Sequence, residues 1–292
     1  MSSGPTLLAP AISDADFKRF SEFFYQRTGI HFGSGKRYFV DKRLQACITH
    51  AGEASFAGWF MAVRLGSQPE LMQDLINEFT VNETYFLRED YQFDCLLKSV
   101  LPEVVAGRRD GRSADPVRIL SLPCSTGEEP YSIALRLLEE WPEIAVTDVS
   151  IYAGDIDTTV LDVARRGRYG RRSLQRVPVT WLQRHFTRDG PEHHVVNDEI
   201  RSAIDFSVIN VCDRGDIGPL GHFDVVFCRN LLIYFDERSS RHATENLYDI
   251  LRPGGFLFLG HSESMSRISG IFTPRRFADA LVYQRPETGD AR

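Results

Sequence analysis

The sequence lacks an apolar run long enough to cross a membrane and lacks the features of a secretory signal. No segment approaches the roughly 18 to 20 apolar residues that a membrane-spanning helix requires. The start of the chain has neither a basic n-region nor the long apolar core of a signal peptide. We therefore expect a cytoplasmic protein that does not insert into a membrane.

Paired cysteines, an excess of positive charge and the common glycine motifs are also missing. The five cysteines include no C-x-x-C pair, which disfavours a disulfide framework and a zinc site, so no metal is expected. A formal net charge of -6 disfavours sequence-independent binding to nucleic acid. Without G-x-G-x-x-G or G-K-S/T, a nicotinamide site or a P-loop has little support.

The hydrophobic pattern changes character part-way along the chain. Its first part shows only helical spacing, as in the phenylalanines between residues 17 and 24, with Ser13 placed to cap the first turn. From residue 117 onward, short apolar strands alternate with helices, which is typical of a parallel sheet covered by helices. We predict a small all-helical domain over residues 1–85 and an α/β domain over residues 86–292.

Residues 168–205 interrupt the alternation of strands and helices. This stretch consists of short polar and β-branched pieces with a turn at Asp189-Gly190-Pro191. We predict that it forms a small β insertion within the α/β domain. The turn Arg252-Pro-Gly-Gly is expected to precede a further strand of the main sheet.

Candidate functional residues follow the strands of the predicted sheet, because open parallel sheets bind ligands beyond the carboxyl ends of their strands. The segment Cys124-Ser-Thr-Gly-Glu-Glu combines small residues with a helix start, which could receive an anionic group. Alone, it could equally be an ordinary strand-to-helix turn. Asp155 ends the next strand and could accept both hydroxyl protons of a ribose, or could instead cap a helix.

Two later strand ends add further polar side chains. Asn210 follows a third strand, where it could address an adenine base. A strongly apolar strand then delivers Arg229, Asn230 and Tyr234 to the same edge of the sheet. Since buried polar groups need partners, Arg229 either takes part in a site or forms a structural salt bridge.

Together these motifs resemble the CheR family of chemotaxis receptor methyltransferases. The resemblance rests on Cys124-Ser-Thr-Gly-Glu-Glu-Pro-Tyr-Ser, Gly154-Asp-Ile-Asp, Cys228-Arg-Asn-Leu-Leu-Ile-Tyr-Phe, Arg252-Pro-Gly-Gly-Phe-Leu and Val81-Asn-Glu-Thr-Tyr-Phe-Leu-Arg-Glu. It extends from about residue 12 to residue 285, in the order of the family. It implies a Rossmann-like class I methyltransferase sheet with a three-stranded insertion, preceded by an all-helical domain.

The resemblance implies transfer of a methyl group from S-adenosylmethionine to glutamate carboxylates of chemoreceptors, with S-adenosylhomocysteine as product. The positions that contact the cofactor in such proteins fall on Asn82, Thr84, Arg88, Glu128, Asp155, Asn210, Val211, Asn230 and Leu231. Tyr234 falls beside the transferred methyl group, and we expect Tyr234 and Arg88 to orient the reacting groups. A catalytically silent S-adenosylmethionine-binding regulator is the alternative.

An amide or adenine methyltransferase has less support. Such enzymes usually carry Asn/Asp-Pro-Pro-Tyr/Phe where this chain has Arg229-Asn-Leu-Leu-Ile-Tyr.

The resemblance also implies that a monomer binds the cytoplasmic helical region of methyl-accepting chemoreceptors. In such proteins a basic helix of the small domain touches the receptor, and in some the β insertion docks a peptide tail at the receptor's C-terminus. The basic clusters here are Lys36, Arg37, Lys42 and Arg43, and Arg165, Arg166, Arg168, Arg171, Arg172 and Arg176. After Arg43 the sequence lacks the additional arginines of many relatives, which leaves the mode of contact open.

Overall fold

The computed structural model describes residues 12–66, 68–109, 115–265, 268–278 and 280–287. The chain forms two compact units, residues 1–81 and 82–292. Within the described ranges, no helix has both the length and the apolar character needed to cross a membrane.

The first unit is helical in its described residues. It contains α1 (Asp14–Thr28), η1 (Ser34–Lys36), α2 (Arg37–His50), α3 (Phe56–Leu65) and α4 (Pro69–Phe79). The predicted cap is confirmed, because the Asp16 N–H donates to Ser13 Oγ at 3.1 Å and the Asp16 carboxylate accepts the Ser13 N–H. An aromatic core joins the helices, with the Phe79 ring 5.0 Å from the Phe20 ring and 5.4 Å from the Phe24 ring between centroids.

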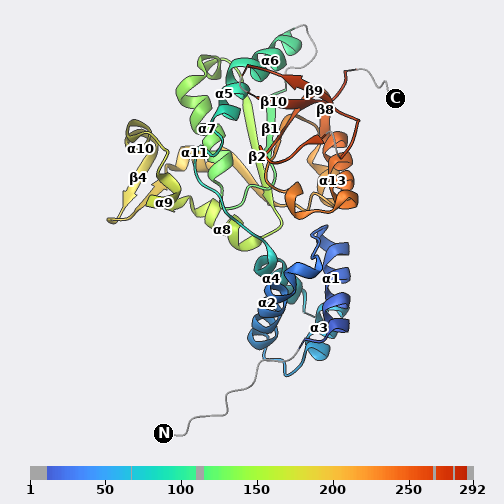
Figure 1. The fold of residues 1–292 in the computed structure, drawn as a ribbon. Helices are drawn as coiled ribbons and strands as arrows, with labels where there is room; N and C mark the ends of the chain where they lie inside the picture. The colour runs from blue at the N-terminus through green and yellow to red at the C-terminus, as the bar shows by residue number, and fades with distance from the viewer. Residues whose placement is uncertain (1–11, 67, 110–114, 266–267, 279, 288–292) are drawn as a thin grey trace. The chain divides into compact units, whose positions relative to one another are not determined.

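The second unit is built on a seven-stranded sheet (Figure 1). Its strands are β1 (Val117–Ser121), β2 (Val149–Asp155), β6 (Ile204–Val208), β7 (Phe223–Cys228), β8 (Leu251–Leu259), β9 (Thr273–Arg276) and β10 (Leu281–Gln284). The order is β6-β2-β1-β7-β8-β10-β9, in which the first five strands are parallel and β10 is antiparallel to both neighbours. The predicted parallel α/β sheet is confirmed.

One sequence prediction within this sheet is wrong. Residues 252–255 do not form a separate turn before a strand, because β8 already begins at Leu251. The pairing of β7 with β8 instead shifts register between Phe223 and Val225, whose partners are Leu251 and Phe256. Gly254 and Gly255 therefore lie at an irregularity within the strand, and Gly254 has a φ of 80°.

Alternate side chains of the central strands enter two separate cores, as expected for strands buried on both faces. Ile119 and Phe227 lie in one core with α5 (Tyr91–Cys95), the π-helical η2 (Leu96–Val100) and α7 (Glu128–Glu140). Their neighbours Leu120 and Cys228 lie in the other core with α12 (Arg214–Ile217) and α13 (Glu237–Ile250). Figure 1 shows α7 and α13 on opposite sides of the sheet.

The predicted β insertion is confirmed as a three-stranded antiparallel sheet. It follows α8 (Thr158–Arg166) and has the strand order β3 (Arg168–Gly170), β5 (His193–Val196) and β4 (Phe186–Asp189). Helices α9 (Arg171–Leu174) and α10 (Val179–His185) connect β3 to β4 (Figure 1). The remaining elements are α6 (Leu101–Arg109), η3 (Pro142–Ala145), α11 (Asp198–Ser202), η4 (Gly218–Leu220) and η5 (Leu232–Tyr234).

Candidate functional site

All the site residues predicted from the sequence lie in the second unit, at one edge of the main sheet. Glu128 begins α7 after β1, and Asp155 ends β2. The residues after β6 are Asn210 and Val211, those after β7 are Asn230, Leu231 and Tyr234, and Asn82, Thr84 and Arg88 belong to the segment before α5. Because β6, β2, β1 and β7 are neighbours and parallel, their carboxyl ends form a single edge.

Backbone hydrogen bonds connect the loops that leave these strands. The Cys124 N–H donates to the Gly154 carbonyl at 2.7 Å, which joins the turn after β1 to the end of β2. The Ile209 N–H donates to the Asp155 carbonyl at 3.0 Å, which joins the loop after β6 to the same point. The loops therefore form one connected rim around Asp155.

Asp155 is buried, and its carboxylate accepts backbone N–H groups from the turns around it. Ser125 donates to Oδ2 at 2.8 Å, and Asp157 donates to Oδ1 at 3.0 Å. Burial raises the pKa of Asp155 to about 6, although these bonds favour the ionised form. The Ile156 N–H also favours the ionised form, and a carboxylate with roughly four lone-pair sites can still accept a further donor.

The helix cap after β2 is Asp157, which the sequence analysis did not single out. Its Oδ1 accepts the N–H groups of Thr159 and Val160 at 2.8 and 3.2 Å. The alternative role for Asp155 as the cap of α8 is therefore wrong. Asp157 Oδ2 accepts a hydrogen bond from Asn82 Nδ2 at 2.8 Å, which fastens the segment before α5 to this turn.

Glu128 is a buried carboxylate whose side-chain hydrogen-bond partners in the described ranges are hydroxyl groups. Thr126 Oγ1 donates to Oε2 and Ser173 Oγ donates to Oε1, each at 2.6 Å. No Lys, Arg or His in the described parts of the chain forms an ion pair with it. Burial raises the pKa of Glu128, and the two hydroxyl groups oppose the increase. A buried anion without a countercharge is costly, so this position suits a ligand cation.

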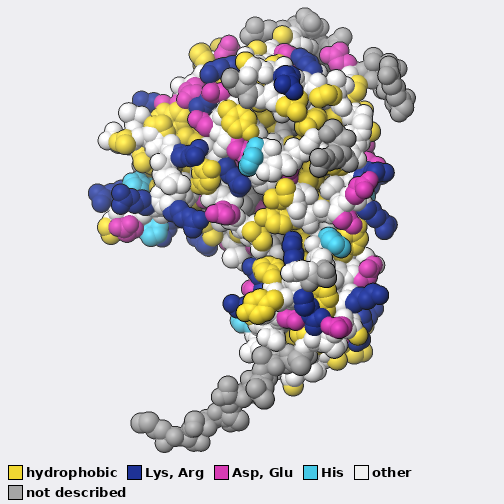
Figure 2. Space-filling view, in the orientation of Figure 1, with side chains coloured by type: hydrophobic (Ala, Val, Ile, Leu, Met, Phe, Trp, Pro, Cys, Tyr) yellow, Lys and Arg dark blue, Asp and Glu magenta, His cyan; other side chains and the backbone are white. Residues whose placement is uncertain are grey.

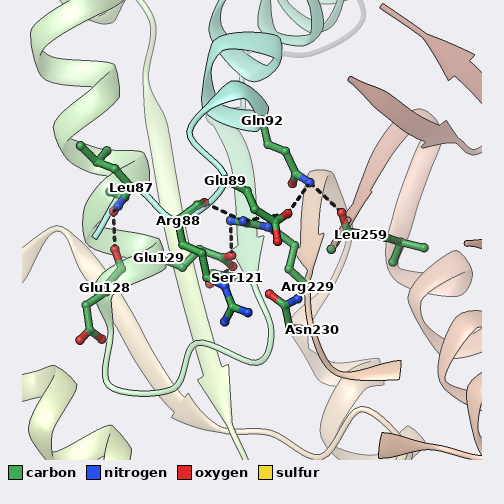
Figure 3. Close-up of polar contacts among 12 residues, drawn as sticks. Leu87, Arg88, Glu89, Gln92, Ser121, Glu128, Glu129, Arg229, Asn230 and Leu259 are labelled. Atoms are coloured by element: carbon green, nitrogen blue, oxygen red, sulfur yellow. Dashed lines mark hydrogen bonds and ion pairs between the residues drawn. The ribbon is translucent and has the colours of Figure 1, made fainter. Parts of the chain in front are cut away.

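The adjacent Glu129 points the other way and belongs to an ion-pair cluster around Arg229 (Figure 3). Arg229 Nη1 lies 2.9 Å from Glu129, and Nη2 lies 3.2 Å from Glu89 and donates to the Arg88 carbonyl at 2.6 Å. Only 2% of the Arg229 side chain is exposed. The salt-bridge alternative for Arg229 is confirmed, and the cluster ties the residues before α5 to the end of β7.

Unusual backbone conformations collect in these same loops. The non-glycine residues with positive φ in the described ranges are Leu87 (58°), Glu89 (56°), Ser125 (49°) and Asn230 (60°). Such conformations cost about 1–3 kcal/mol each and persist where surrounding contacts hold them. Leu87 donates its N–H to Ser132 Oγ at 2.9 Å, and Asn230 donates its N–H to Glu263 at 2.8 Å. The clustering indicates a functional site without reference to any motif.

Glu263 is a second organising residue that the sequence analysis missed. Besides Asn230, it accepts N–H groups from Leu232 at 2.7 Å and from Gly260 at 2.8 Å. The turn that leads from β7 to Tyr234 is therefore wrapped around one carboxylate. The local sequence shows only the contact with Gly260, because Asn230 and Leu232 are 33 and 31 positions away from Glu263.

Arg88 and Tyr234 lie on the two loops that the Arg229 and Glu263 contacts organise. Arg88 Nη1 donates to the Glu83 carbonyl at 2.7 Å. Figure 3 shows its guanidinium apart from the Arg229 cluster, on the side of Asn230. Burial raises the pKa of Tyr234, and the positive charge of Arg88 opposes this, so the two side chains interact electrostatically.

The remaining predicted residues have mainly local contacts. Asn210 Oδ1 accepts the Cys212 N–H at 3.0 Å, and the Val211 carbonyl accepts a bond from Asn246 at 2.8 Å. The Leu231 carbonyl accepts the Tyr234 N–H. Thr84, which lies between Asn82 and Arg88 in the sequence, is half-buried. In the described ranges no group of three or more His, Cys, Asp or Glu is arranged to hold a metal ion.

Two family models cover almost all of the described chain. "CheR methyltransferase, all-alpha domain" matches residues 15–80, and "CheR methyltransferase, SAM binding domain" matches residues 82–279. The chain belongs to the CheR methyltransferase family. The second unit is thus the S-adenosylmethionine-binding domain of the family, which confirms the predicted family, fold class and cofactor.

Curated relatives of the family match nearly the whole chain. It is 47% identical to chemotaxis protein methyltransferase 2 of Vibrio cholerae, over 95% of each chain. It is 36% identical to the chemotaxis protein methyltransferase of Escherichia coli, over 91% of this chain and 90% of the relative. The likeness therefore includes both units of this CheR family member.

Replacing Arg229 by Met is expected to lower the free energy of unfolding by about 3–5 kcal/mol, because two carboxylates lose their buried partner. Arg172→Met is the matched control. Arg172 also pairs with a glutamate, but 88% of its side chain is exposed, so about 1 kcal/mol or less should be lost. Urea denaturation followed by circular dichroism measures both, and equal losses would contradict a special role for the Arg229 cluster.

Proposed function

We propose that this protein transfers the methyl group of S-adenosylmethionine to glutamate carboxylates of chemoreceptors, releasing S-adenosylhomocysteine. The names of its relatives support a role in chemotaxis. The observation that carries the proposal is that the acids Glu128 and Asp155, and the pair Arg88 and Tyr234, come from loops at the same edge of the sheet. This edge thus offers acids to a cationic cofactor, and a guanidinium and a hydroxyl to an anionic substrate.

The residues present fit the cofactor. Its ammonium suits Glu128, which is buried with hydroxyl partners, and its ribose diol suits the Asp155 carboxylate at the end of β2. Asn82, Thr84, Asn210, Val211, Asn230 and Leu231 complete the proposed cofactor site. When bound, the cofactor supplies an electrophilic methyl group on a sulfonium centre.

The chain's own residues are needed for orientation rather than for proton transfer. A glutamate side chain with a pKa of about 4.3 is already ionised at neutral pH, so no general base is required. We assign Arg88 to orienting a carboxylate and Tyr234 to positioning it against the methyl group. Alignment of this kind can be worth roughly 7–11 kcal/mol, and exclusion of water adds to it.

We place the reaction in the cytoplasm and propose a monomer that binds the helical region of the receptor. Receptor helices that present glutamates are acidic, and exposed arginines gather on the β insertion, over which Figure 2 shows several dark blue side chains. The structure separates the basic residues into two kinds. Arg37 forms ion pairs with Asp14 and Asp41, whereas Lys42 and Arg171 are exposed and form no ion pair within the described ranges.

Affinity for S-adenosylhomocysteine is expected to fall as the pH drops through about 6. The raised pKa of Asp155 means that its acceptor form is lost below that value, so affinity should decrease about tenfold between pH 7 and pH 5. Asp155→Asn should weaken binding by about 1–3 kcal/mol at pH 7.5 and flatten this part of the profile. Calorimetry across pH checks both, and a parental profile in the variant would remove Asp155 from the cofactor site.

Tyr234→Phe is expected to lower methyl transfer more than it lowers cofactor affinity, because the hydroxyl is proposed to act beside the reacting groups. The assay uses membranes that contain candidate receptors and methyl-labelled cofactor, and it measures base-labile label on glutamates. The parental protein should transfer the label. Cofactor binding without transfer to any receptor would instead favour the silent regulator, and equal turnover of parent and variant would leave Tyr234 as a packing residue.

Charge reversal at exposed basic residues should slow methylation at subsaturating receptor. Lys42→Glu and Arg171→Glu test one residue in each cluster, and added salt should reproduce the effect because it screens exposed charges. Affinity for S-adenosylhomocysteine is the control and should not change. Parental rates in both variants over a range of salt concentrations would show that recognition depends on other residues.

A further inference from the structure

The β insertion reaches the proposed cofactor site through Ser173. This residue lies in α9, between strands β3 and β4 of the insertion, and its hydroxyl donates to Glu128 Oε1 at 2.6 Å. Thr126, from the turn after β1, binds the other oxygen at the same distance. The Glu128 carboxylate is therefore held from two sides, once by its own turn and once by the insertion.

Three further contacts join the insertion to the same region. Tyr169 of β3 is buried and donates its hydroxyl to the Thr126 carbonyl at 2.6 Å. The Ser173 carbonyl accepts the Phe86 N–H at 3.1 Å, and the Phe86 ring lies 4.8 Å from the Tyr169 ring between centroids. The insertion thus contacts both the turn that carries Glu128 and the segment that carries Arg88.

The space around the turn leaves little freedom for a different arrangement. Gly127 has a φ of 94°, and a Cβ added to it would lie 2.8 Å from the Ala164 Cβ and 2.9 Å from the Tyr169 hydroxyl oxygen. Interiors packed this closely transmit small shifts instead of absorbing them. The position of β3 therefore constrains the residues on either side of Gly127, which are Thr126 and Glu128.

Figure 3 shows why Glu128 needs this support. Its carboxylate points away from the Arg229 cluster, toward which the neighbouring Glu129 is directed. Glu129 is oriented by an ion pair with Arg229 at 2.9 Å. Glu128 has no such ion pair among the described residues, and the side-chain donors that hold its oxygens are the Thr126 and Ser173 hydroxyls.

We propose that Ser173 is a positioning residue of the cofactor site, which holds the Glu128 carboxylate in the orientation that receives the ammonium group of S-adenosylmethionine. The inference rests on the proposed role of Glu128. It makes the β insertion part of the cofactor site, because a hydroxyl from the insertion sets the affinity of the main domain for its cofactor.

This arrangement has a pH signature that a purely structural serine would not have. Burial raises the pKa of Glu128, and the Ser173 and Thr126 hydroxyls lower it. Loss of the Ser173 hydroxyl should raise the pKa of Glu128 further. As the pH falls, the variant should therefore lose binding at a higher pH than the parental protein does. The titratable groups that face Glu128 are Tyr169 and Cys124, and the pKa of each is raised well above its ordinary value, so both stay neutral throughout.

The test measures binding of S-adenosylhomocysteine to the full chain by calorimetry between about pH 5.5 and pH 8. Ser173→Ala should weaken binding about tenfold at neutral pH and should move the acidic limb of the profile to higher pH. Ser173→Thr keeps a hydroxyl and should recover most of the affinity. Ser202→Ala, an exposed serine of the short helix α11, is the matched control and should bind as the parent does.

A double-variant comparison separates positioning from general damage. In a Glu128→Gln background, Ser173→Ala should have little further effect, because the group that it positions has lost its charge. Parental affinity and pH profile in Ser173→Ala, or effects of the two substitutions that simply add, would overturn the inference. Failure of the proposed function would look different, because the parental protein itself would then bind no cofactor or transfer no methyl group.

Discussion

The buried ion-pair cluster around Arg229 is the interaction on which the rest of the site depends. One guanidinium, almost fully removed from solvent, contacts Glu89, Glu129 and the Arg88 carbonyl. A charge in this position is costly without partners, so the end of β7, the start of α7 and the segment before α5 must come together when the domain folds. The cluster therefore determines where the loops with Arg88, Asn230 and Glu128 begin.

Two adjacent glutamates at the start of α7 have different roles, because only one of them pairs with Arg229. Glu129 is neutralised inside the protein by Arg229, and it has a structural role. Glu128 faces the opposite way, is held by hydroxyl groups, and keeps an unbalanced charge that we assign to the cofactor. Leu87, Glu89 and Asn230 have left-handed backbone conformations in the neighbouring loops. Contacts with a side-chain hydroxyl, an ion pair or a carboxylate restrain each of these loops.

The β insertion packs directly against the turn after β1, which carries Glu128 of the proposed cofactor site. Tyr169 and Ser173 follow α8 in the chain. Their hydroxyl groups donate hydrogen bonds to the Thr126 carbonyl and the Glu128 carboxylate. This geometry provides a physical route by which contacts on the insertion could influence cofactor binding. It requires no large movement, because the contacts are direct hydrogen bonds in a closely packed region.

The sequence by itself determined the features that depend on local chemistry. The cap at Ser13, the alternation of strands and helices and the β insertion all follow from periodicity and turn residues, and the motifs identify the CheR family. The tertiary structure decided which polar groups are used up inside the protein and which are left for a ligand. Asp157 rather than Asp155 caps α8, Arg37 is engaged by acids, and Ser173 meets a glutamate 45 positions away. The Asp157 cap and the Arg37–Asp41 pair are local contacts, and the backbone geometry decides between them and their alternatives. Ser173 and Glu128 meet only because distant segments pack together, and no short window of sequence contains both partners.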